Sequence, residues 1–286
     1  MYRVPELARL GRAFRSTAET ALTETEMEYV VTCIKHVYTS HVVLQFNVLN
    51  TIDDQRLVDV CVAVEVSDAD GSYVVERVVP ASVARYGERA MCFVVLHRQS
   101  AVGIAEEGSA ELACTLGCEL QFRVVAVNPT TGEAESEGDR GYEEVYPLEG
   151  VEVSAKDFMA KVAVADFRRA WEQAGSGAEG GSAAGGGVEV MEKFGLPFKK
   201  MDEAVSAVLD YLGMQALEGT ATVSPDDGNA KKGLHSLHLS GMFVGGVPVL
   251  ARAMLQLDEK AGGVVLKIAV RSPSARVCRY VADCIN

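Results

Sequence analysis

The sequence has no apolar run near the roughly 20 residues that a membrane-spanning helix needs, and its first residues lack the basic and then apolar layout of a secretory signal. We therefore expect a cytosolic protein. Its seven cysteines are an odd number, scattered through apolar stretches. This usage favours buried free thiols in a reducing compartment and argues against a disulfide framework.

Common enzyme motifs are also missing. The sequence contains no G-x-x-x-x-G-K-[ST] phosphate loop, no G-x-S-x-G nucleophile elbow and no H-E-x-x-H zinc motif. His235 and His238 resemble a metal-ligand pair, but residues three apart on a strand point to opposite faces. Cys33 and His36 fail as a pair for the same reason. We expect no enzyme activity, no cofactor and no metal site.

The formal net charge is −13. The excess of acidic residues lies wholly in residues 1–154, whereas residues 155–286 carry equal numbers of acidic and basic side chains. An acidic first half repels phosphate backbones and anionic lipids. We therefore expect no nucleic-acid partner and no direct insertion into a membrane.

Short runs rich in valine and aromatic residues alternate with polar turns between residues 22 and 154. They predict strands at residues 29–38, 42–49, 58–66, 73–79, 91–97, 112–127 and 145–153. Strands of this length and spacing are typical of an immunoglobulin-like β-sandwich. Residues 1–21 are expected to be a linker or a short helix.

The pattern changes in residues 155–286, which predict an α+β subdomain with an antiparallel sheet and flanking helices. The expected elements are a helix at residues 199–212, closed by Gly213, and strands at residues 234–244, 247–257 and 264–270. Gly245 and Gly246 predict a tight hairpin between the first two of these strands. The glycine-rich residues 175–187 are expected to form a flexible loop.

The one tryptophan of the chain, Trp171, follows Phe167 by four positions. Asp166 can cap a short helix there, and the i, i+4 spacing places both rings on one helical face. Two rings in this pattern commonly pack under their own subdomain. An exposed tryptophan, however, is a large rigid anchor for a binding partner. The residues alone leave both interpretations open.

Several segments of the chain resemble one known family. They are residues 22–31, 35–36, 51–55 and 128–133 in the first half, and residues 202–205, 212–214, 239–246 and 271–272 in the second. In this order they resemble the C-terminal appendage, or ear, of the γ subunit of coatomer, the COPI vesicle coat. The resemblance covers nearly the whole chain and implies a β-sandwich followed by a platform subdomain.

The resemblance implies a protein that recruits accessory proteins, such as Arf GTPase-activating proteins, through peptide motifs during Golgi-to-ER vesicle transport. It implies a docking site with Trp171 exposed, Phe167 buried as its support, and Arg252 and Arg271 nearby. Other coatomer subunits would bind through an N-terminal trunk, so the expected location is the cytoplasm, peripheral on Golgi membranes and COPI vesicles. A Trp171→Ser variant is then expected to fold but to lose the Arf GTPase-activating partner.

Two alternatives remain. The chain could be an appendage of another adaptor or coat complex that docks short peptide motifs through the same groove. It could also be a small hydrolase that uses Cys33 with His36, or a cryptic metal at His235 and His238. Identification of co-purifying subunits distinguishes the first alternative, and metal analysis with thiol labelling distinguishes the second.

Overall fold

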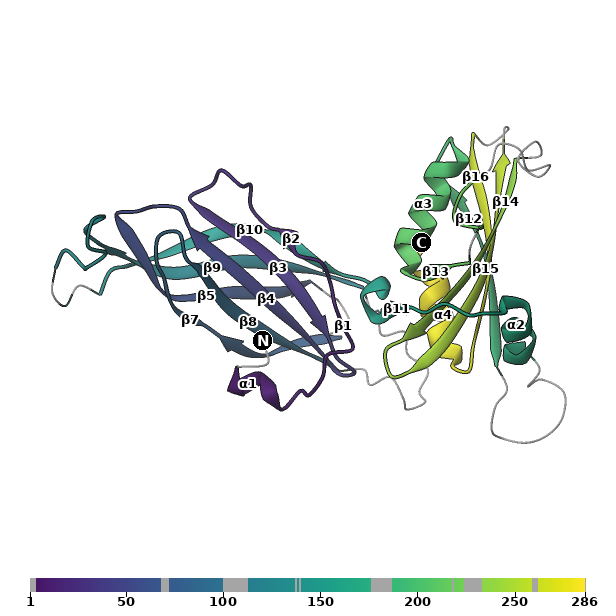
Figure 1. Ribbon diagram of the computed structural model, residues 1–286, viewed down its shortest axis with the longest axis horizontal. Coiled ribbons are helices and arrows are strands. Elements are labelled where there is room, and N and C mark those ends of the chain that lie inside the picture. The colour runs from purple at the N-terminus through teal and green to yellow at the C-terminus, as the bar shows by residue number, and fades with distance from the viewer. Residues whose placement is uncertain are drawn as a thin grey trace. The chain divides into compact units, whose positions relative to one another are not determined.

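The computed structural model describes residues 4–67, 72–99, 113–136, 138, 140–175, 187–217, 219–223, 233–258 and 262–285. The chain divides into two compact units, Met1–Val153 and Ser154–Asn286 (Figure 1). Sheets dominate both units, and the pairings between their described strands are antiparallel. The predicted antiparallel character is therefore confirmed. No helix within the described ranges is both long and apolar enough to cross a membrane.

The first unit contains two sheets. One has the order β1-β3-β4-β8-β6, with β2 paired to β3, and the other has the order β10-β9-β5-β7. The strands are β1 (Arg15–Ser16), β2 (Thr20–Ala21), β3 (Tyr29–Val37), β4 (His41–Asn50), β5 (Gln55–Ser67), β6 (Tyr73–Val79), β7 (Ala81–Ala84), β8 (Arg89–Arg98), β9 (Cys114–Ala126) and β10 (Tyr142–Val153). The ring of Tyr29 on β3 contacts that of Phe122 on β9, with centroids 4.8 Å apart. The two sheets therefore share a core, while the immunoglobulin-like connectivity stays a prediction.

The segment expected to be a linker or short helix contributes to the first unit. Its helix α1 (Pro5–Ala8) buries Leu7 against Val43 of β4 and Val95 of β8. The strands β1 and β2 then extend the sheet by pairing with β3. The N-terminal segment thus covers part of the outer face of the first sheet.

The second unit is one sheet with helices. Its strand order is β11-β14-β15-β16-β12, with β13 paired to β14. The elements are η1 (Ala155–Phe158), β11 (Met159–Lys161), α2 (Phe167–Gly175), β12 (Val188–Leu196), α3 (Met201–Leu212), β13 (Gln215–Ala216), β14 (Leu234–Phe243), β15 (Val247–Asp258), β16 (Gly263–Ser272) and α4 (Ala275–Asp283). The predicted helix and the three predicted strands of this half are confirmed. Of the predicted loop 175–187, residues 176–186 lie outside the described residues.

Glycines produce two of the predicted chain reversals. Gly213 ends α3 in the left-handed conformation, with φ of 59°, where its backbone nitrogen donates to the carbonyl of Leu209. Gly245 and Gly246 have φ of 87° and 79° and connect β14 to β15. Both positions need a backbone conformation that side chains with a Cβ rarely adopt.

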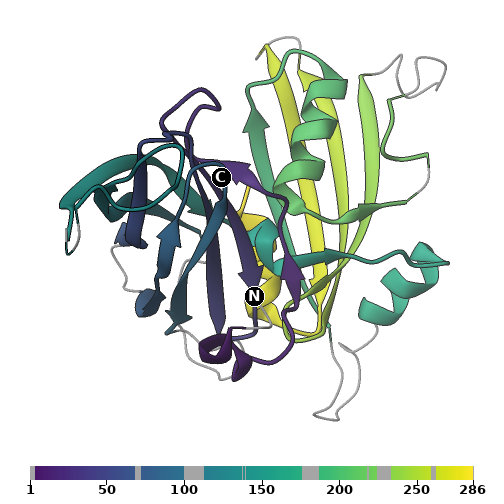
Figure 2. The ribbon, with the colours of Figure 1, turned by 60° about the vertical axis from the view of Figure 1, so that its left-hand side comes forward.

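The two faces of the second sheet differ in burial. Leu255, Leu266 and Val270 lie on one face and have 0% exposure, and the helices α3 and α4 contact the strands that carry them. Figure 1 shows α2 on the side of the sheet opposite to α3, and Figure 2 shows α3 in green in front of the strands. Because alternate residues of a strand face opposite sides, the α2 side presents a different set of side chains.

Candidate functional site

The helix α2 begins at the predicted cap. The carboxylate Oδ1 of Asp166 accepts a hydrogen bond of 2.9 Å from the backbone nitrogen of Arg169, which satisfies a free N–H group of the first turn. Phe167 and Trp171 share one helical face, and their rings stack with centroids 5.8 Å apart and planes inclined by 23°. Both rings pack onto Leu250 of β15. The predicted cap and the shared face are confirmed.

Two arginines from the sheet contact the indole ring. The guanidinium carbon of Arg252 lies 4.3 Å from the centroid of the Trp171 ring, and that of Arg271 lies 4.4 Å from it. Arg271 also donates a hydrogen bond of 2.7 Å from Nη1 to the backbone carbonyl of Trp171 and forms an ion pair with Glu189 of β12. A guanidinium over an aromatic face contributes about 0.5–2 kcal/mol, depending on desolvation. The structure thus brings together the four residues that the resemblance singled out.

The predicted exposure of Trp171 is wrong. Trp171 and Phe167 are each only 5% exposed. The same i, i+4 spacing that groups the rings explains this, because a short helix that turns one ring toward the sheet must turn both. The guanidinium groups of Arg252 and Arg271 also contact the indole. A Trp171→Ser variant would therefore lose core packing, and loss of binding by this variant would not identify a contact residue.

Beside α2, the same face of the sheet is open and forms a groove of about 530 Å³. Its floor is built from two rows of cross-strand neighbours on β14, β15, β16 and β12. The first row is His238, Arg252, Ala269 and Met191, and the second is Ser236, Met254, Lys267 and Lys193. Met191 is 72% exposed and Met254 is 46% exposed, so the floor offers apolar surface to solvent. We call this surface the β14–β12 groove.

Arg252 and His238 line the groove and also contact the aromatic pair formed by Phe167 and Trp171. The His238 ring stacks on Phe167, with centroids 4.8 Å apart and planes inclined by 14°. Burial, and then the charge of Arg252, hold the pKa of His238 below its usual value, so the ring is neutral at pH 7. Burial, and then the neighbouring Arg271, lower the pKa of Arg252. Its Nε is buried with no hydrogen-bond partner among the described residues.

The charged residues that line the groove are mainly basic. Arg252, Lys193 and Lys267 contribute positive charge, and Glu192 contributes a carboxylate. A groove with this balance attracts segments that carry acidic residues. The negative net charge of the whole chain does not reveal this local reversal, because the second half of the sequence is neutral as a whole.

Sequence reasoning missed the groove residues Met191, Met254, Lys193 and Lys267, and it considered His238 only as a metal ligand. One signal was available. On β15, Met254 occupies an outward position between buried Ala253 and Leu255. A single exposed apolar residue is ordinary on a protein surface, so this position becomes informative only when the sheet register adds Met191 to the same face.

The pairs considered for a hydrolase are held in structural roles. His235 donates a hydrogen bond of 2.8 Å from Nε2 to the carbonyl of Thr220, while His238 stacks on Phe167, so the two rings point to different faces as predicted. Cys33 is 3% exposed, and burial raises the pKa of its thiol to about 12. A protonated buried thiol is a poor nucleophile, which argues against the hydrolase alternative.

We predict that Cys33, Cys92 and Cys118 are not hyperreactive in the native protein. Burial raises the pKa of Cys92 to about 12 and that of Cys118 to about 11, so at pH 7 thiol labelling of these residues and of Cys33 should be more than about 100-fold slower than in denaturant. Mass spectrometry after timed alkylation measures each site, with the urea-unfolded chain as the control. A native thiol among them that reacts as fast as in urea would contradict the prediction.

Comparison with known proteins yields one family. A family profile described as "Coatomer gamma subunit appendage platform subdomain" matches residues 1–154, and one described as "Coatomer subunit gamma-1 C-terminal appendage platform" matches residues 156–285. Coatomer subunit gamma-2 of Danio rerio is 36% identical over 275 residues, which cover 96% of this chain and 28% of that protein. Coatomer subunit gamma of Arabidopsis thaliana is 36% identical over 283 residues, which cover 99% of this chain and 29% of that protein.

Human coatomer subunit gamma-1 is also similar, with 36% identity over 94% of this chain and 28% of that protein. The chain thus spans 28–29% of the length of these relatives. Among solved structures, the GAE domain of yeast GGA1 matches 47% of this chain and 97% of its own, with 10% sequence identity and a TM-score of 0.28.

Proposed function

Since this chain belongs to the coatomer γ-subunit appendage family, we propose that it acts as a non-enzymatic appendage that recruits accessory proteins to the COPI coat. Arf GTPase-activating proteins are the proposed partners, and Golgi-to-ER vesicle transport is the proposed process. Other coatomer subunits would bind the remainder of the subunit. The protein would then be cytoplasmic and peripheral on Golgi membranes and COPI vesicles. Membership of this family favours a COPI appendage over an appendage of another adaptor.

We also propose the domain division predicted from the sequence. Residues 22–154 would form an immunoglobulin-like sandwich, and residues 155–286 would form the docking subdomain. Two observations support this division. The boundary between the compact units and the boundary between the two matched family profiles both lie near residue 154.

The proposed docking surface is the β14–β12 groove, which includes Arg252. The observation that carries this proposal is the exposed apolar surface of Met191 and Met254. It lies on a sheet face whose charged groups are mainly basic. Exposed apolar patches mark interaction sites, and methionine adapts its shape to different partners. Trp171 and Phe167 would support Arg252 and His238 from behind.

The chemistry of the groove favours a segment that combines an apolar side chain with acidic residues. The apolar side chain would contact the two methionines, and the acidic groups would pair with Lys193, Lys267 and Arg252. An open groove of this kind implies weak binding, with a dissociation constant on the order of micromolar. Many copies of the appendage in one coat would raise the effective affinity.

We predict that the double variant Lys193→Glu with Lys267→Glu binds an acidic segment of an Arf GTPase-activating protein at least about tenfold more weakly than the unaltered chain. The stability should change by less than about 0.5 kcal/mol per site, because surface substitutions seldom cost more. Fluorescence anisotropy with a labelled peptide at about 0.1 M salt measures the binding.

The matched control is Lys161→Glu with Lys199→Glu, which makes the same change in charge at exposed positions outside the groove. Its binding should stay within about twofold of the unaltered chain. The proposed surface is rejected if the groove variant binds normally, or if the control loses as much affinity as the groove variant.

A further inference from the structure

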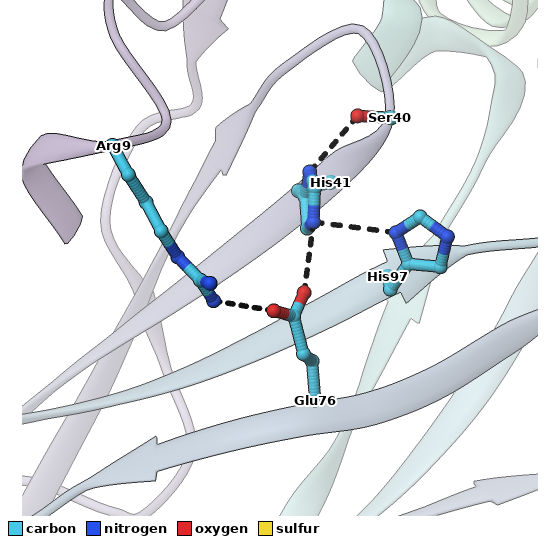
Figure 3. A network of polar contacts seen from close by, with 5 residues as sticks. All are labelled: Arg9, Ser40, His41, Glu76 and His97. Carbon is cyan, nitrogen blue, oxygen red and sulfur yellow. Dashed lines mark hydrogen bonds and ion pairs between the residues drawn. The ribbon is translucent and has the colours of Figure 1, made fainter. Parts of the chain in front are cut away.

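Three residues of the first unit bring potential metal-ligand atoms together (Figure 3). They are His41, Glu76 and His97. The Nε2 atom of His41 lies 2.8 Å from Oε2 of Glu76 and 3.2 Å from Nδ1 of His97. The three ligand atoms all lie within 4.8 Å of one another. This set is independent of the β14–β12 groove, whose lining residues all come from the second unit.

The strand register explains why these side chains meet. His41 of β4 lies directly opposite His97 of β8, so both imidazoles lie on the same face of the sheet. On the other side of β8, the pairing with β6 shifts between Val75 and Arg77, and Glu76 has no cross-strand partner in this register. An irregularity of this kind bends a strand and re-aims a side chain.

Two neighbouring groups contact the cluster. Ser40 Oγ lies 2.9 Å from Nδ1 of His41, and this contact fixes the imidazole with Nε2 directed toward Glu76 and His97. Arg9, which follows α1, forms an ion pair with the other carboxylate oxygen of Glu76. Hydrogen bonds to the non-ligating atom of a histidine are the usual way in which proteins orient a metal ligand.

The cluster presents three electron-rich atoms to one small volume. Two imidazole nitrogens and a carboxylate oxygen repel one another unless a proton or a metal cation lies between them. For a tetrahedral zinc ion with bonds of about 2.0–2.1 Å, neighbouring ligand atoms stand about 3.3 Å apart. The separations of 2.8 Å and 3.2 Å are close to this value. Two histidines and one carboxylate are also a ligand set that zinc uses in proteins.

We propose that His41 Nε2, His97 Nδ1 and Glu76 Oε2 form a binding site for Zn²⁺, with a fourth position for water. The side chains of His41 and Glu76 are 18% and 32% exposed, so an ion can enter from solvent. The nitrogen ligands disfavour Mg²⁺ and Ca²⁺, which prefer oxygen. This proposal revises the expectation from sequence that the chain has no metal site.

A bound ion would crosslink three strands of the first sheet. His41, Glu76 and His97 belong to β4, β6 and β8, and β4 and β8 also carry the residues on which Leu7 of α1 packs. The site would therefore stabilise the region on which the N-terminal segment rests. This role does not depend on the docking function proposed for the second unit.

The test uses the full chain after removal of metals by a chelator. Isothermal titration with ZnCl₂, with a chromogenic zinc chelator as competitor, should show one equivalent bound per chain. His97→Ala and Glu76→Gln should each weaken this binding at least tenfold, and His41→Ala with His97→Ala should abolish it.

His235→Ala is the matched control, since His235 bonds the carbonyl of Thr220 in the second unit. This variant should bind zinc as the unaltered chain does. Circular dichroism of Glu76→Gln checks that the fold is kept, which we expect because Glu76 is exposed. The proposal is overturned if the unaltered chain binds no equivalent of zinc, or if the His97 and Glu76 variants bind it equally well.

A variant of Arg9 provides a second test of whether Glu76 is a zinc ligand. The guanidinium of Arg9 pairs with Glu76 and opposes a second cation at the same carboxylate. Arg9→Ala should therefore bind zinc at least as tightly as the unaltered chain and up to about fivefold more tightly, since an exposed ion pair contributes about 0–1 kcal/mol. Weaker binding by this variant would contradict ligation by Glu76.

Discussion

Replacement of Trp171 by alanine is expected to destabilise the second unit by about 3–5 kcal/mol, the usual range for removing a buried aromatic side chain. The indole is 5% exposed and packs with Phe167 on Leu250. Alanine would leave a cavity between α2 and the sheet, and Arg252 and Arg271 would lose the ring that their guanidinium groups contact. Urea unfolding of the full chain, followed by circular dichroism, measures the loss.

Met254→Ala is the appropriate control, because Met254 is an apolar residue of the same sheet that is 46% exposed. Met254→Ala should lower the free energy of unfolding by no more than about 0.5 kcal/mol. If Trp171→Ala costs less than about 1 kcal/mol, then the ring does not pack as described. For partner binding, the lysine reversals in the groove are the better test, because Trp171 variants combine any loss of contact with a loss of packing.

Replacement of Arg271 by alanine should have the second largest effect, a loss of about 1.5–3 kcal/mol, as expected for hydrogen bonds that involve a charged group. Arg271 joins three elements. It lies on β16, donates to the backbone carbonyl of Trp171 in α2, and pairs with Glu189 of β12. Its removal would leave that carbonyl and the Glu189 carboxylate without this donor. The same unfolding experiment measures the effect.

Arg271→Lys separates charge from geometry. Lysine keeps the positive charge but lacks the planar fork that reaches two acceptors at once. The free energy of unfolding of Arg271→Lys should therefore lie between those of the unaltered chain and the alanine variant. The double variant Trp171→Ala with Arg271→Ala should lose less than the sum of the single losses, since residues in contact couple by at least about 0.5 kcal/mol. Full additivity, or an alanine variant as stable as the unaltered chain, would contradict the contacts described.

Local patterns predicted many of the elements. Alternating apolar residues predicted β14, β15 and β16, because the period of two is a property of the extended chain itself. Gly245 and Gly246 predicted the hairpin because they tolerate positive φ. Asp166 and the spacing of Phe167 and Trp171 predicted a capped helix with both rings on one face. The family resemblance then grouped these residues with Arg252 and Arg271.

Sequence reasoning failed where the answer depended on contacts between distant segments. The exposure of Trp171 depends on which face of α2 meets the sheet, and the groove depends on the lateral register of four strands. The cluster of His41, Glu76 and His97 likewise requires three strands and one irregular pairing. Apart from the outward position of Met254, these relations leave no local trace, because burial and cross-strand contact are properties of the assembled sheet.

The sequence by itself therefore determined the antiparallel sheets, the capped helix and the identity of the family, since each rests on short-range spacing or on motifs in order. Only the tertiary structure decided that the indole is buried and that the open surface lies beside it. It also decided that two histidines and a glutamate converge in the first unit. The physical reason is that solvent exposure is set by what packs on a residue, and the packing partners here lie up to 100 positions away along the chain.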